Sequence, residues 1–127
     1  EMLRERFKSH SKLSLTELTT NNCDAKFFTK AENIVNNNLS DEYFSVDDLA
    51  EKLNLSRSQL FRKFKAVTGY NPSEYIRVKR IDLAKDLLNE GNLNVTEVSE
   101  KSGFRPPSYF IAIFKKHTGL TPREYTA

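Results

Sequence analysis

Apolar side chains recur at intervals of three and four residues along most of the chain, which is the spacing of one helix face. Sustained alternation and Asn-Gly or Asp-Gly hairpin pairs, the usual signs of strands, do not occur in the sequence. The longest periodic stretch, Pro72 to about Leu88, predicts a helix of roughly 25 Å at 1.5 Å per residue. The pattern therefore predicts an all-α fold of about seven helices. The apolar positions that we assign to the core are Phe27, Ala31, Ile34, Val35, Val46, Leu49, Ala50, Leu53, Leu60, Phe64, Val67, Ile76, Leu83, Ala84, Leu87, Val95, Val98, Phe110, Ile113 and Phe114.

Helix boundaries are marked by capping residues and by glycine. At five places a Ser, Asn or Thr stands three residues before an acid or amide, a spacing at which each side chain accepts a hydrogen bond from the other residue's backbone N–H. These pairs are Ser45/Asp48, Ser56/Gln59, Asn71/Glu74, Asn94/Glu97 and Thr121/Glu124. Pro72 and Pro122 then fall at the first helical position, where a missing N–H is tolerated. Helix ends are expected at Gly69, Gly91, Gly103 and Gly119.

The chain also contains an internal repeat. With a shift of 50 residues, positions 58–75 and 108–125 share eight identities in eighteen positions, and upstream the shift becomes 49. Each copy predicts a short helix, a tight turn at Asn54 or Gly103, and a longer helix, which is the helix-turn-helix arrangement. We therefore predict two helix-turn-helix subdomains joined by a long linker helix. The expected boundaries are 1–23 for a linker or partly ordered segment, 24–71 for the first subdomain, 72–89 for the linker helix and 90–127 for the second subdomain.

Charge is distributed unevenly, although the chain of 127 residues has a net charge of only +3. Residues 41–51 contain five acids and no base, whereas residues 56–65 contain only bases among their charges: Arg57, Arg62, Lys63 and Lys65. In a helix-turn-helix the second helix enters the DNA major groove, where Arg pairs with guanine and Gln with adenine. The basic helix is thus a candidate DNA-contacting element. A solvated helix face is the alternative interpretation of such a charge run.

Other functional classes have little support. The single cysteine, Cys23, excludes an internal disulfide, and we interpret it as an inert thiol in a polar linker. His10 and His117 do not have metal-ligand spacing, and no apolar run of 18 residues occurs. We expect no enzyme activity, metal, cofactor or small-molecule ligand, since no nucleophile–base set or Gly-rich phosphate loop is present. A helical module that binds a protein, such as a polymerase subunit, is the alternative to DNA binding.

Two stretches carry a family resemblance. SRSQLFRKFKAVTGYNPSEYIRVKRIDLAKDLL, followed by VSEKSGFRPPSYFIAIFKKHTGLTPREY, resembles the C-terminal DNA-binding domain of AraC/XylS-type transcription regulators, with a match from about Phe27 to Tyr125. The resemblance implies a non-enzymatic, seven-helix domain that inserts two helices into successive major-groove segments of promoter or operator DNA. It implies base contacts by Arg57, Ser58, Gln59, Arg62, Pro107, Ser108, Tyr109 and Ala112. We expect phosphate contacts from Ser56, Lys63, Lys65, Arg105, Lys115 and Lys116.

The second set of base contacts departs from the family pattern, which usually has Arg at the position of Ala112. An alanine offers only an apolar contact, for example to a thymine methyl group. We therefore expect the first of the two DNA-contacting helices to determine most of the sequence preference. The second is then expected to contribute mainly affinity and positioning.

The start of the chain is similar to a segment of hybrid two-component regulators. The stretch RERFKSHSKLSLTELTTNNCDAKFFTKAENIV resembles the connection between a receiver domain and this kind of DNA-binding domain. It implies a parent that fuses a sensor kinase to its response regulator, anchored to the bacterial inner membrane, with this domain in the cytoplasm. We expect the chain to be a fragment, since it begins with Glu1, and expect dimerisation through regions outside it and contact with RNA polymerase. The alternative is that residues 1–23 have little structure.

Overall fold

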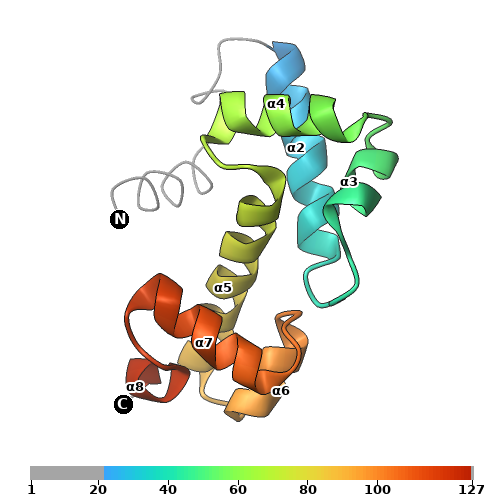
Figure 1. Ribbon diagram of the computed structural model, residues 1–127. Coiled ribbons are helices and arrows are strands. Elements are labelled where there is room, and N and C mark those ends of the chain that lie inside the picture. The colour runs from blue at the N-terminus through green and yellow to red at the C-terminus, as the bar shows by residue number, and fades with distance from the viewer. Residues whose placement is uncertain (1–21, 127) are drawn as a thin grey trace. The chain divides into compact units, whose positions relative to one another are not determined.

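The computed structural model describes residues 22–126, and over these residues it contains seven helices and no strand (Figure 1). This confirms the predicted all-α fold of about seven helices. Most of the expected N-terminal linker lies outside the described residues. The prediction that Cys23 lies in a linker was wrong, because its backbone belongs to the first turn of a helix. In chain order the helices are α2 (Asn22–Asn37), α3 (Val46–Lys52), α4 (Arg57–Thr68), α5 (Pro72–Glu90), α6 (Val95–Lys101), α7 (Pro107–Thr118) and α8 (Pro122–Thr126).

The chain divides into two compact units. The described part of the first unit comprises residues 22–36 and 45–75, and that of the second comprises 37–44 and 76–126. The division falls inside α5, between Tyr75 and Ile76. The predicted subdomain boundaries, which treat α5 as a linker helix of its own, stay a prediction. No helix among the described residues is long and apolar enough to cross a lipid bilayer.

The core of the first unit is a cluster of aromatic rings. Phe28 of α2, Phe64 of α4 and Tyr75 of α5 lie with their ring centroids 5.1–5.7 Å apart in edge-to-face arrangements. Each such pair contributes about 0.5–1.5 kcal/mol beyond the area that it buries. Burial raises the pKa of the Tyr75 hydroxyl, and the negative charge of Glu32 raises it further. This cluster fixes α4 across α2 (Figure 1).

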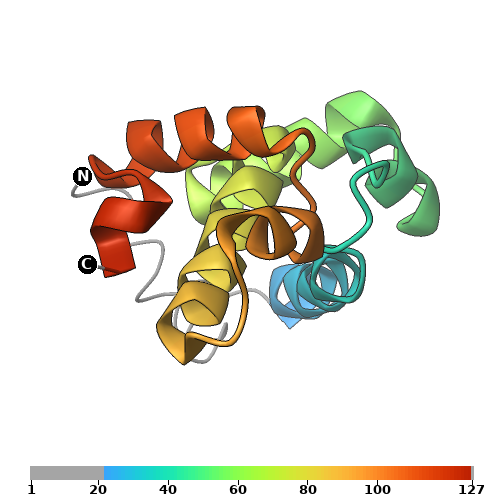
Figure 2. The ribbon, with the colours of Figure 1, turned by 90° about the horizontal axis from the view of Figure 1, so that it is seen from below.

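The core of the second unit is built around α7. Phe110 and Phe114 of α7 are fully buried and their rings lie 5.6 Å apart. Phe104, in the turn before α7, packs on Phe110 at 5.4 Å, and Tyr125 of α8 packs on Phe114 at 5.4 Å. Helix α6 lies at the first turns of α7 and α8 lies at its last turn, so both ends of α7 are held (Figure 2). The other buried residues of this core are Ile81, Ala84, Leu88 and Val98.

The five predicted helix starts and the ends at Gly69, Gly91 and Gly119 are confirmed, whereas α6 ends at Lys101, two residues before the expected Gly103. All five capping pairs form their reciprocal hydrogen bonds, with N···O distances of 2.8–3.2 Å. Gly69 and Gly119 end α4 and α7 at φ of 80° and 83°. The two tight turns contain Asn54 at φ 57° and Gly103 at φ 84°, so both predicted turn residues adopt the left-handed conformation.

The prediction of the core was least accurate in α5. Leu83 and Leu87 are only half-buried, whereas Tyr75, Val78, Ile81 and Leu88 are buried and were not predicted. The physical reason is that α5 contributes Tyr75 to one core, and its later residues to the other. A helix buried on more than one side has no single apolar stripe, so the 3.6-residue period does not show which residues are inside.

Candidate nucleic-acid interface

Helix α4 presents a polar face to solvent because its opposite face is fixed in the core. Leu60 and Phe64 are fully buried. The helix begins at a capping box in which the Ser56 hydroxyl accepts from the Gln59 N–H at 3.1 Å. The exposed side chains include all the residues of this helix and its cap that the sequence predicted as DNA contacts: Ser56, Arg57, Ser58, Gln59, Arg62, Lys63 and Lys65.

Arg57, at the first position of α4, already has a partner. Its Nη1 lies 2.6 Å from Oδ1 of Asp47 in α3, and its guanidinium lies 5.5 Å from the centre of the Phe61 ring. The two charged side chains are 60% and 73% exposed, and pairs this exposed contribute at most about 1 kcal/mol. The pair therefore orients Arg57 while leaving it free to exchange Asp47 for another acceptor.

Gln59 offers less to a base than its residue type indicates. A glutamine recognises adenine with both its amide oxygen and its amide nitrogen. In this structure the amide oxygen accepts from the Ser56 N–H at 2.9 Å to complete the capping box. Gln59 therefore offers a base its amide nitrogen as a donor and only the second lone pair of its oxygen, unless half of the box opens.

The two lysines predicted to contact phosphate from α4 lie at the sides of this face. Lys63 places its ammonium 5.1 Å from the centre of the Phe27 ring, and Lys65 donates to the Gly69 carbonyl at 3.3 Å. Both side chains remain exposed. Such contacts cost little to give up, so both ammonium groups can move to a phosphate.

Helix α7 occupies the corresponding place in the second unit but presents a different surface. Its cap, Pro106, makes no side-chain hydrogen bond, and Pro107 is the first helical residue. Of the predicted base contacts, Ser108, Tyr109 and Ala112 are exposed, whereas Pro107 is half-buried. Tyr109 packs against Phe104 with ring centroids 6.0 Å apart.

An exposed isoleucine on α7 was not predicted from the sequence. Ile111 is 38% exposed and stands next to Ala112. Because Phe110 and Phe114 set the buried stripe, position 111 falls outside it. The position of Ile111 relative to Phe110 and Phe114 could have indicated its exposure, because an isoleucine outside the buried stripe does not reach the core. Ile111 and Ala112 thus place two apolar side chains on the exposed part of α7.

Basic residues stand at both ends of α7. Lys115 and Lys116 are exposed in its last turn, and Arg105 precedes its first turn. The Nε of Arg105 lies 3.1 Å from Oε1 of Glu42. No group of three or more His, Cys, Asp or Glu side chains that could hold a metal ion occurs in the described part of the chain.

Comparison with known proteins identifies the family. A family model described as a helix-turn-helix domain matches residues 49–127. The chain is 33% identical over 123 residues to Histidine kinase P4 of Formosa agariphila, a match that covers 97% of this chain and 9% of that protein. A transcriptional regulator from Chromobacterium violaceum, described as containing an AraC-type DNA-binding domain, superposes with a TM-score of 0.75 at 30% identity, covering 84% of this chain and 94% of that one.

A second solved structure is the DNA-binding domain of AdpA, a global transcriptional factor, in complex with a target DNA. It superposes with a TM-score of 0.73 at 28% identity, covering 77% of this chain and 87% of that one. The fold, the two tight turns and the family model agree with the resemblance carried by the sequence. The chain therefore belongs to the AraC/XylS-type family of helix-turn-helix DNA-binding domains found in transcription regulators.

Proposed function

We propose that this chain binds double-stranded DNA sequence-specifically, with α4 and α7 each inserted into a major-groove segment. The observation that carries the proposal is that each unit fixes one helix from behind with buried aromatic residues and exposes its other side. A helix held in this way meets the groove without losing much further conformational freedom. The DNA complex of the similar AdpA domain supports this use of the fold.

The two helices recognise DNA by different chemistry. On α4, Arg57 and Arg62 have the donors that pair with guanine, while Ser58 and Gln59 add single hydrogen bonds. On α7, the exposed apolar side chains of Ile111 and Ala112 favour thymine methyl groups. The remaining base contacts that we propose for α7 are Pro107, Ser108 and Tyr109. Since hydrogen bonds discriminate among bases more sharply than apolar contacts, α4 determines most of the preference.

Phosphate contacts supply most of the affinity. We propose that they come from Ser56, Lys63, Lys65, Arg105, Lys115 and Lys116. Each neutralised phosphate lowers the slope of log K against log salt by about 0.9. With about six contacts, affinity falls roughly a thousandfold between 50 and 200 mM salt.

The parent protein is proposed to be a two-component regulator of which this chain is the output domain. This rests on the match to a histidine kinase, of which the chain spans 9%. On this proposal the kinase activity belongs to the parent, which is anchored to the inner membrane, and the chain itself is a binding module in the cytoplasm. Dimerisation through other regions of the parent raises the modest affinity of a single domain, and RNA polymerase is a further partner.

Selection from randomised duplex DNA at moderate salt tests the proposal. The wild-type chain is expected to recover two blocks of preferred bases about one helical turn apart. Arg57→Ala and Arg62→Ala are expected to remove the preference in one block and leave the other. Binding that depends on salt but selects no motif would overturn the proposal and favour a protein-interaction module.

A further inference from the structure

Segment 37–44 connects α2 to α3 in the chain but is packed within the second unit. Its backbone is held by Arg80 of α5, whose Nε donates to the Leu39 carbonyl at 3.1 Å and whose Nη2 donates to the Asp41 carbonyl at 2.7 Å. Leu39 is buried. Arg80 thus holds the backbone of the segment at Leu39 and at Asp41.

The same segment lies against the turn between α6 and α7. The Ser40 hydroxyl donates to the Lys101 carbonyl at 2.6 Å. A Cβ at Gly103 would overlap the Leu39 carbonyl oxygen and the Arg80 side chain, so the turn approaches the segment as closely as a glycine allows. The turn and segment 37–44 therefore form one packed element of the second unit.

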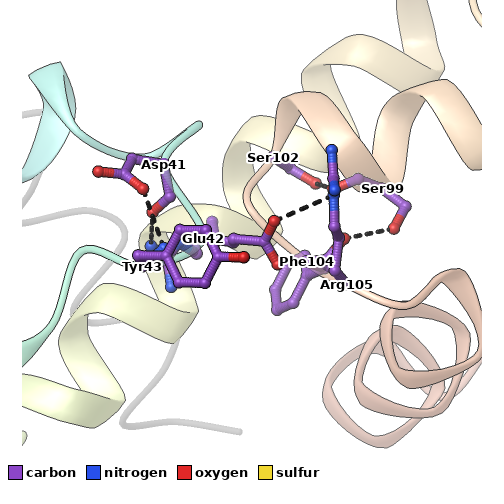
Figure 3. A network of polar contacts seen from close by, with 8 residues as sticks. Asp41, Glu42, Tyr43, Ser99, Ser102, Phe104 and Arg105 are labelled. Atoms are coloured by element: carbon purple, nitrogen blue, oxygen red, sulfur yellow. Dashed lines mark hydrogen bonds and ion pairs between the residues drawn. The ribbon is translucent and has the colours of Figure 1, made fainter.

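Two buried serines fix the turn from its other side. The Ser99 hydroxyl donates to the Phe104 carbonyl at 2.7 Å (Figure 3). The Ser102 hydroxyl donates to the Val98 carbonyl at 2.7 Å. Since Arg105 directly follows Phe104, its backbone enters α7 from a defined position. The freedom that remains to Arg105 is that of its side chain.

Glu42 removes much of this remaining freedom. The Asp41 carboxylate accepts from the Tyr43 N–H at 2.9 Å, which forms a local turn with Glu42 at its centre (Figure 3). The Glu42 side chain is only 24% exposed, and its Oε1 lies 3.1 Å from Nε of Arg105, which is 58% exposed. Glu42, the more buried partner, is held in place by the fold. It in turn holds the more exposed side chain of Arg105.

The nitrogen that Glu42 occupies decides what Arg105 can still bind. A guanidinium has five N–H donors in one plane, and its end pair, on Nη1 and Nη2, matches two oxygens of a phosphate. Glu42 contacts Nε. The outward N–H groups of Nη1 and Nη2 point away from Nε, so they stay available to a ligand.

We propose that Glu42 is a positioning residue for DNA binding, which holds Arg105 so that Nη1 and Nη2 of its guanidinium meet a phosphate beside the start of α7. This inference rests on the proposed function, because it needs Arg105 at a phosphate. An arginine that is already ordered loses less side-chain entropy on binding. The saving for one flexible side chain corresponds to an affinity difference of roughly three- to tenfold.

The test compares Glu42→Gln with Glu42→Ala, because both variants lack the negative charge that repels DNA. Glutamine keeps an oxygen acceptor for Nε of Arg105, whereas alanine does not. Binding to a fixed duplex is measured at several salt concentrations, and urea unfolding of each variant serves as the control for folding. We expect Glu42→Gln to bind about three- to tenfold more tightly than Glu42→Ala.

The same pair of substitutions in an Arg105→Ala background provides the decisive control. With Arg105 removed, the two Glu42 variants are expected to bind equally. If Glu42 only supported the fold of segment 37–44, the difference between them would persist. Arg105→Ala alone is expected to make the slope of log K against log salt less negative by about 0.9, as for one lost phosphate contact.

An independent variant covers the case in which Glu42→Ala does not fold. Arg105→Lys keeps the positive charge but has no planar fork, so it is expected to bind several-fold more weakly than wild type. Equal binding by the two Glu42 variants, or by Arg105→Lys and wild type, would overturn the inference while leaving DNA binding intact. A wild-type chain that binds no DNA at low salt would instead overturn the proposed function.

Discussion

Helices α4 and α7 are copies of one design that present different surfaces. Each has 12 residues, and their bounds are related by the 50-residue shift of the sequence repeat. Phe64 and Phe114 are both fully buried, and Gly69 and Gly119 both end their helices in the left-handed conformation. Yet α4 exposes arginines and lysines along most of its length, whereas α7 exposes Ile111 and Ala112 in its middle and has lysines only in its last turn. The repeat keeps the residues that folding requires and varies those that a partner meets.

The turns before α4 and α7 also share a conformation and differ in what surrounds them. Asn54 and Gly103 both have positive φ. Only at Gly103 is the space for a side chain taken, because the Leu39 carbonyl and Arg80 lie there. The second turn is thus supported by a segment from elsewhere in the chain. Position 103 therefore needs glycine because no side chain fits there. Position 54 needs only a residue that tolerates positive φ.

The largest expected effect tests the part of the repeat that is shared. Phe64→Ala and Phe114→Ala each remove a fully buried ring from an aromatic cluster, and each is expected to cost about 3–5 kcal/mol of unfolding free energy. Urea unfolding measures both. A cost below about 1 kcal/mol for either variant would show that its helix is not fixed by its core.

A second pair of substitutions separates contact from conformation. Gly103→Ala places a Cβ against backbone at positive φ and is expected to lower the unfolding free energy by about 3 kcal/mol or more. Gly119→Ala has the same φ penalty but open space, so it is expected to cost only about 1 kcal/mol. Equal losses in thermal or urea unfolding would contradict the close packing of segment 37–44 against the turn.

A third prediction concerns the difference in base recognition. Arg62→Ala is expected to remove about 1–3 kcal/mol of discrimination at one base pair of the first block. Tyr109→Ala is expected to weaken binding to preferred and altered duplexes nearly alike, since an apolar contact discriminates less. Competition binding with single-base variants of the selected site measures both effects. If the two substitutions relaxed base preference to the same degree, the proposed division of roles would be wrong.

The smallest expected effect concerns how the two helices begin. Ser56 caps α4 through its hydroxyl, whereas Pro106 provides no side-chain cap for α7. Ser56→Ala is expected to cost about 1 kcal/mol of unfolding free energy, measured without DNA. Ser58→Ala, on the exposed first turn of the same helix, is the matched control and is expected to change stability by less than about 0.5 kcal/mol. If Ser56→Ala and Ser58→Ala lowered the unfolding free energy equally, the capping hydrogen bonds of Ser56 would not stabilise the helix.

The sequence predicted most of what depends on local chemistry. Capping pairs, left-handed turn residues and the buried stripe of α4 are set by neighbours three or four residues apart, so their pattern is visible in the chain. This is why the start of α5 at Asn71 and Pro72 was predicted at the correct residue. The exposed face of α4 followed from the same periodicity, whereas the residues named on α7 came from the family resemblance, and exposed Ile111 was missed.

The features that were missed depend on contacts between distant residues. Nothing near Glu42 in the sequence indicates Arg105, and nothing near Asp47 indicates that it pairs with Arg57 across ten residues. Burial of Tyr75 depends on Phe28 of another helix. Such pairs arise from tertiary packing, which a pattern of local spacing does not contain. The base and phosphate contacts themselves stay a prediction.

The most direct test of two dissimilar DNA-contacting helices changes single atoms of the selected DNA site. Replacing thymine by uracil removes only the C5 methyl group, and replacing guanine by 7-deazaguanine removes only the N7 acceptor. The account predicts that uracil weakens binding in the block contacted by α7 and that 7-deazaguanine weakens it in the block contacted by α4. The opposite assignment, or equal sensitivity of both blocks to both replacements, would contradict it.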